Sequence, residues 1–225
     1  LTKYKFLFNK KINLIPVYFR TGTITFSDKK KYVASIKNVN INTKFKKNSI
    51  LTKLEGNFLN EIININFDIK DIDTKISNEI ILKMLDLNFL IKSTFSDSEK
   101  NNGSKNGNFL IKKDKHKIAG LFNYKNNKFT INKSNIRNAF IDGKLEGKII
   151  FLPYFDFNLD LALNSINFTK LYNYFLSLHE DEQKDLFRIN NKINGKINLS
   201  ADKVYSKHNL VKSFESRVKF YNGNV

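Results

Sequence analysis

The sequence contains no cysteine and no tryptophan, and only two prolines and one methionine among 225 residues. Without cysteine there are no disulfides and no thiolate metal sites. The cysteine content therefore does not indicate whether the protein works in an oxidising or a reducing compartment. No apolar run approaches the roughly 18 residues of a transmembrane helix. The chain starts at Leu1 with no secretory signal pattern after it. We therefore expect a fragment of a longer protein, with any export signal or membrane anchor outside it.

The formal net charge is +18, but only four of the 39 basic residues are arginines. Lysine, asparagine, isoleucine and phenylalanine are abundant together, as an AT-rich coding sequence produces. Lysines also recur on the polar sides of the expected strands, where they keep a sheet soluble and protect its edges. We therefore expect a solvated basic surface and no specific nucleic-acid site. A polyanion-binding module and attraction to an anionic membrane surface are the alternatives.

Alternation of apolar and polar residues is the dominant pattern. In "FDFNLDLALNSINF" (155–168) apolar residues occupy every second position from Phe155 to Leu163, which places them on one face of a strand. The phase then slips at Asn164 and Ser165, which predicts a bulge. Similar alternation at 39–45, 63–69, 85–91 and 214–220 predicts a mainly β chain of about a dozen largely antiparallel strands.

Two segments interrupt this pattern within what we expect to be a single domain over 1–225. The segment 96–108 has no apolar residue and predicts a flexible polar insertion. The segment 169–189 predicts a short helical hairpin. Thr169 is the expected N-cap, and Leu171 and Phe175 keep helical spacing.

No arrangement of residues in the sequence indicates catalysis. The three histidines lie in unrelated contexts, and only His179 has carboxylates nearby, which suits a solvated helix start. Metalloprotease, nucleophile-elbow, P-loop and dinucleotide-binding motifs do not occur. We therefore expect a protein that is not an enzyme and has no cofactor and no metal.

The expected helices total about 20 residues, too few to cover the apolar side of a dozen strands. Two sheets packed as a sandwich, a closed barrel and an open trough filled by an apolar ligand all solve this problem. Uneven strand lengths and the helical segment argue against an outer-membrane barrel. The pattern alone leaves the sandwich and the trough open.

The segment 126–178, which contains "GKLEGKIIFLP" and a long alternating strand ending in "LNSINFTKL" before a helix, resembles the AsmA-like family. These bacterial proteins are relatives of TamB and of the eukaryotic bridge-like lipid-transfer proteins. The segments 22–42, 54–71 and 194–204 are similar in style.

The resemblance implies a long, twisted, taco-like sheet with an open apolar groove that shields phospholipid acyl chains. It implies a periplasmic protein, anchored to the inner membrane by a segment outside this chain. The implied role is lipid transport between the membranes and outer-membrane biogenesis. The implied partners are the bacterial envelope membranes and proteins embedded in them.

The groove candidates share the alternating apolar positions. They are Ile63, Ile65, Phe67, Ile69, Leu85, Leu87, Phe89, Phe155, Phe157, Leu159, Leu161 and Leu163. In a sandwich the same side chains would form the core. The alternative functions are a structural or adhesive β-sandwich that binds proteins through its strand edges, and a basic polyanion-binding module.

Overall fold

A computed structural model describes residues 15–28, 31–58, 60–72, 75–97, 103–150, 156–180, 183, 194–207 and 211–221. Across these residues the chain is mainly β, with fourteen strands in open, mostly antiparallel sheet and one helix, which confirms the predicted fold class at this level. The chain divides into two compact units, Leu1–Asp114 and Lys115–Val225. Each unit is described by itself.

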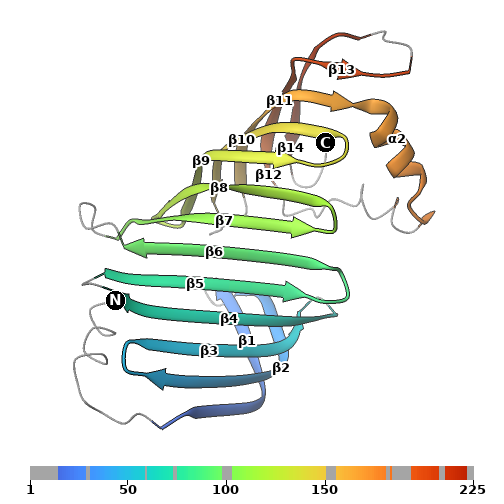
Figure 1. Cartoon of the computed structure of the whole chain (residues 1–225). Coiled ribbons are helices and arrows are strands. Elements are labelled where there is room, and N and C mark those ends of the chain that lie inside the picture. The colour runs from blue at the N-terminus through green and yellow to red at the C-terminus, as the bar shows by residue number, and fades with distance from the viewer. Residues whose placement is uncertain are drawn as a thin grey trace. The chain divides into compact units, whose positions relative to one another are not determined.

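Unit 1 is a meander of seven strands in which each strand pairs antiparallel with the next (Figure 1). The strands are β1 (Val17–Asp28), β2 (Lys31–Lys46), β3 (Ser49–Phe58), β4 (Glu61–Ile72), β5 (Lys75–Met84), β6 (Phe89–Asp97) and β7 (Lys105–Lys113). This order keeps every strand beside its sequence neighbour, so short turns suffice to connect them.

The pairing register gives unit 1 one apolar face. Ile65 lies opposite Leu54 and Leu82, and residues opposite each other in an antiparallel pair point to the same side. We call this side the unit 1 apolar face. Its apolar members on the central and last strands are Ile50, Leu54, Ile63, Ile65, Phe67, Ile69, Ile76, Ile80, Leu82, Met84, Phe89, Ile91, Phe95, Phe109 and Ile111.

The other side of unit 1 is mainly polar. It carries the Lys70–Asp68 ion pair at 3.0 Å and the Lys92–Glu79 ion pair at 2.8 Å. The hydrogen bond from Lys70 to Asp68, aided by the attraction between their charges, raises the pKa of the exposed Lys70 ammonium. Both pairs lie at the surface, where such bridges stabilise a fold only slightly.

The core of unit 1 consists of two buried clusters on the apolar face. One contains Ile36, Val39 and Ile63, and the other contains Ile50, Ile69 and Ile76. Gly56 lies against the first cluster, and a Cβ there would meet the side chain of Ile36 at 2.7 Å. Glycine is therefore required at this position for β2 and β3 to pack closely.

The predicted strand 85–91 is wrong over its first half. Leu85 and Leu87 lie in the turn between β5 and β6, and they are 63% and 41% exposed. The amide of Asn88 donates to the carbonyl of Leu85 at 3.0 Å, and Asn88 adopts φ 47°. Asn tolerates this left-handed conformation, which allows a hairpin turn here. Apolar and polar residues nevertheless alternate across the whole segment, so the alternation alone does not reveal the turn.

The connection between β6 and β7 is shorter than the predicted polar insertion 96–108. β6 extends to Asp97 and β7 begins at Lys105, paired with it. Ladder hydrogen bonds hold these polar residues in strands although they lack apolar side chains. Residues 98–102 of the predicted insertion lie outside the described residues.

Unit 2 contains the remaining strands and the helix. The strands are β8 (His116–Lys125), β9 (Lys128–Arg137), β10 (Ile141–Ile150), β11 (Asp156–Asn167), β12 (Asn194–Ala201), β13 (Val204–Tyr205) and β14 (Phe214–Phe220), with α2 (Phe168–Leu176) after β11. β8 to β11 pair antiparallel in order. β12 and β13 then pair parallel to β11, and β14 pairs antiparallel with β12 (Figure 1).

Unit 2 also has one apolar face, which we name the unit 2 apolar face. Leu159 lies opposite Gly147 on β10 and beside Ile197 on β12, and Ile197 lies opposite Val218. The further apolar members from β9 to β14 are Phe129, Ile131, Ile136, Ile141, Leu145, Ile149, Phe157, Leu161, Leu163, Ile166, Leu199, Ala201, Phe214 and Phe220. The predicted bulge is confirmed, because the register skips Asn164 between Leu163 and Ser165.

The helix begins earlier than predicted. Its N-cap is Asn167, whose side-chain Oδ1 accepts a hydrogen bond from the Lys170 amide at 2.9 Å, so Thr169 lies in the first turn. α2 ends at Leu176, with Ser177 as its C-cap. Of the predicted hairpin 169–189, residues 181–182 and 184–189 lie outside the described residues.

Candidate functional site

Part of the unit 1 apolar face is open to solvent. Leu82, Ile91 and Ile111 form one row across β5, β6 and β7, and all three are only partly buried. Ile80 lies in the adjacent row and is also partly exposed. Among the described residues, the two buried clusters of this unit and the side chains packed against them include none of these four residues. The rows therefore offer a partly exposed apolar surface beside the buried clusters.

Lysines lie at both ends of the last strand of unit 1. By the period of two along β7, Lys105 and Lys113 belong to the same face as Phe109 and Ile111. The Lys105 ammonium lies 5.3 Å from the centre of the Phe95 ring, a cation–π contact. The two lysines are about 26 Å apart at roughly 3.3 Å per residue. The apolar side chains of β7 thus lie between two positive charges.

The unit 2 apolar face has an open part along β11, β12 and β14. Leu159, Ile197 and Val218 form a row across these strands, and all three are partly exposed. In the next row the rings of Phe157 and Phe220 lie 5.4 Å apart. Gly147 of β10 lies opposite Leu159, and Gly195 of β12 lies beside Phe157. Because glycine has no side chain, neither neighbour covers these two residues on this face.

The other end of the unit 2 apolar face is filled by the protein itself. Leu163, Ile166, Ala201 and Val204 form a buried cluster, and Leu171 of α2 packs against it. Nearby, the rings of His116, Phe140 and Tyr174 lie 5.4 Å from one another. These contacts seat α2 at one end of the face, while the rows of Leu159 and Phe157 stay open.

The structure places the described groove candidates in three environments. Ile63, Ile69 and Leu163 are 1%, 3% and 2% exposed and belong to buried clusters, so they fill protein cores. The exposed turn holds Leu85 and Leu87. Phe155 lies outside the described residues. The partly exposed candidates on the two apolar faces are Ile65, Phe67, Phe89, Phe157, Leu159 and Leu161.

Sequence reasoning missed several side chains of the open rows, chiefly Ile80, Leu82, Ile197 and Val218. In β5 the alternation is obscured, because Asn78 is buried on the apolar face and Ile81 points to the polar face. Asn78 is held there by a hydrogen bond to the carbonyl of Phe95 at 3.4 Å. Reading Ile76, Ile80, Leu82 and Met84 as one series, with a polar exception, would have found this strand.

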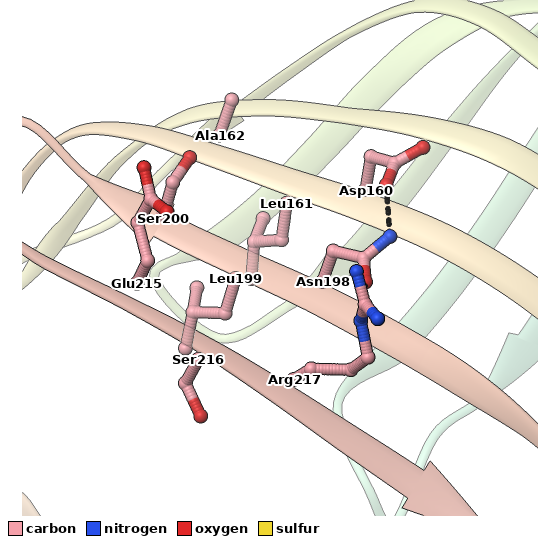
Figure 2. Close-up of a pocket in the computed structure, with 9 residues that line it drawn as sticks. All are labelled: Asp160, Leu161, Ala162, Asn198, Leu199, Ser200, Glu215, Ser216 and Arg217. Atoms are coloured by element: carbon pink, nitrogen blue, oxygen red, sulfur yellow. Dashed lines mark hydrogen bonds between the residues drawn. The ribbon is translucent and has the colours of Figure 1, made fainter.

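A shallow depression lies over β11, β12 and β14 of unit 2 (Figure 2). Within it, Asn198 Nδ2 donates to Asp160 Oδ1 at 2.6 Å, and Arg217 Nε donates to Asn198 Oδ1 at 2.9 Å. These polar groups satisfy one another in a row across three strands. Among the described residues no group of three or more His, Asp or Glu side chains could hold a metal ion.

Comparison with known proteins identifies no relative: no family model, no curated protein and no solved structure matches the chain. The described part of the chain contains no helix whose length and hydropathy would let it cross a membrane.

Proposed function

We propose that the apolar faces of the two units bind the acyl chains of phospholipids and shield them from water during transport between membranes. The observation that supports this most directly is the open row Leu82, Ile91 and Ile111, with its counterpart Leu159, Ile197 and Val218 in unit 2. A soluble sheet rarely leaves contiguous apolar surface uncovered unless something binds there.

The spacing of the β7 lysines suits an acyl chain. Lys105 and Lys113 are about 26 Å apart along the strand, and one leaflet of a bilayer's hydrocarbon core is about 15 Å thick. Acyl chains bind such a surface in proportion to area, at about 25 cal/mol per Å². A phosphate headgroup would stay in water beside Lys105 or Lys113. This mode of binding selects lipids by their apolar area, without a specific pocket.

The rest of the proposal follows from the sequence resemblance to the AsmA-like family. It places the protein in the periplasm, held at the inner membrane by a segment outside this chain. It assigns a role in outer-membrane biogenesis that needs neither catalysis nor a cofactor. The partners would be the envelope membranes and proteins embedded in them.

The experiment is native mass spectrometry of the purified chain, with organic extraction and identification of lipids that co-purify. We expect bound phospholipid, and we expect Leu82→Asp to lose the part bound by unit 1, because a carboxylate in the open row opposes an acyl chain. Ile81→Asp is the matched control, since it adds the same charge to the opposite face of the same strand. In unit 2, Leu159→Asp and Asn158→Asp form the corresponding pair.

The proposal fails if the wild-type chain purifies without lipid and takes up none from vesicles while remaining folded. It also fails if Ile81→Asp removes as much lipid as Leu82→Asp. Circular dichroism distinguishes loss of lipid from loss of fold. An unfolded Leu82→Asp variant would mean that protein covers the row, which contradicts an open lipid-binding face.

A second candidate, binding of proteins by strand addition, is favoured by the free edge of β1. Within the described part of unit 1, β1 pairs only with β2, and Val17, Tyr18 and Phe19 are about half exposed. Such an edge is a template for another strand. Phe19→Lys should abolish concentration-dependent association in sedimentation velocity. If the wild type stays monomeric at all concentrations and binds no extended peptide, this candidate is excluded.

A further inference from the structure

The helix α2 carries a stripe of apolar side chains that are partly exposed to solvent. Phe168, Tyr172 and Leu176 recur every four residues, so they lie along one side of the helix. They are 37%, 62% and 55% exposed. Leu171, on another side, packs against the buried cluster of unit 2, and the Phe168 ring lies 5.6 Å from the Phe214 ring of β14. Tyr172 and Leu176 are therefore the members of the stripe that lie mainly in solvent.

The neighbouring strand β13 adds to this exposed surface. Tyr205 is 51% exposed and pairs in register with Asn167, the N-cap of α2. The Val204 amide donates to the Lys212 carbonyl at 2.9 Å, which brings the segment with the 43% exposed Val211 beside β13. Apolar and aromatic side chains from three segments thus gather at this end of unit 2, which we call the α2–β13 end.

Exposed lysines accompany these side chains. Lys170 is on α2, Lys203 and Lys207 flank β13, and Lys212 is in the adjoining segment. The exposed carboxylates nearest to them in the same described segments are Glu180, Asp202 and Glu215. The four lysines therefore outnumber the three carboxylates, and the whole chain is basic at +18.

We propose that the α2–β13 end docks on a lipid bilayer that carries anionic headgroups. Tyrosine and phenylalanine favour the membrane–water interface, and an apolar helix stripe inserts at this depth. Lysines beside it are attracted to an anionic surface. A second copy of this chain is disfavoured as the occupant, because docking two such ends would bring their lysines together.

Docking does not depend on lipid binding by the apolar faces, and the two are measured separately. Lipid binding is read from extracted lipid, and docking is read from attachment of the whole chain to vesicles. If both hold, α2 places one end of the unit 2 apolar face at the membrane.

The experiment is co-sedimentation of the full chain with vesicles of phosphatidylcholine, with and without 30% phosphatidylglycerol. We expect binding to the anionic vesicles that falls as salt rises. The double variant Tyr172→Ser and Leu176→Ser should bind about tenfold more weakly, because it removes most of the inserting surface. The control is Leu121→Ser, which removes a 50% exposed apolar side chain from β8 of the same unit.

The electrostatic part has its own pair of variants. Lys203→Gln with Lys207→Gln should weaken binding by about fivefold for each lysine removed. Lys144→Gln with Lys148→Gln removes two exposed lysines from β10 and should change it little. No binding, or equal losses in test and control variants, would overturn the proposal. Equal binding to neutral and anionic vesicles would overturn its anionic preference.

Discussion

Unit 1 and unit 2 each form a sheet with one apolar face, but the directions and connections of their strands differ. In unit 1 every pairing is antiparallel and each strand follows its neighbour. In unit 2, β11 and β12 are parallel, joined by a connection that includes α2. Leu159 still lies beside Ile197, and Leu161 beside Leu199. Side chains alternate with a period of two in either direction, so the apolar face is independent of strand polarity.

The units also differ in how they use glycine. Gly147 and Gly195 of unit 2 adopt φ 137° and 147° within their strands, and a Cβ on either would meet a backbone carbonyl oxygen of β11. Gly22 of unit 1 has no such conformation, and a Cβ there would meet the ring of Phe19. Gly147 and Gly195 therefore tolerate a side chain less well than Gly22.

The largest effect should be shared by both units. Ile63→Ala in unit 1 and Leu163→Ala in unit 2 each empty the centre of a buried cluster. Each should lower the free energy of unfolding by about 3–4 kcal/mol in urea titrations. The partly exposed Ile65→Ala and Leu159→Ala should cost about half as much. Equal costs at all four positions would mean that the open rows are as well packed as the cores.

The next effect should separate the units. Gly147→Ala should destabilise the chain by about 3 kcal/mol, since its Cβ meets the carbonyl of Asn158 and its φ is unfavourable for alanine. Gly22→Ala should cost less than about 1 kcal/mol, because the half-exposed Phe19 ring can rotate away. Thermal unfolding of both variants provides the measurement. A larger cost at Gly22 would reverse the comparison.

The smallest effect concerns α2 of unit 2. The described residues of unit 1 contain no helix. Asn167→Ala removes the N-cap hydrogen bond to the Lys170 amide and should cost about 1 kcal/mol. Hydrogen exchange at Lys170 should accelerate about fivefold. Thr169→Ala is the control and should change stability by less than about 0.5 kcal/mol. If Thr169→Ala has the larger effect, the cap has been assigned to the wrong residue.

Alternation predicted the strands and their faces where one residue type dominates each side. β4 and β11 follow the expected pattern, and the bulge at Asn164 was visible as a slip of phase. The pattern failed at Leu85 and Leu87, because a tight turn at Asn88 leaves no trace in the order of apolar and polar residues. The helix was predicted, but its N-cap was not, since Asn167 and Thr169 are both good capping residues.

The sequence by itself determined that this chain forms strands with one apolar and one polar side, because apolar and polar residues alternate with a period of two along it. Only the tertiary structure decided which apolar residues are buried and which stay open. Ile63 and Ile65 share a strand and a face, yet Ile63 is 1% exposed and Ile65 remains partly exposed. Burial depends on which neighbouring strands bring side chains over a position, and that follows from register and bulges. The parallel pairing of β11 with β12 likewise depends on the path of the chain, which local alternation does not encode.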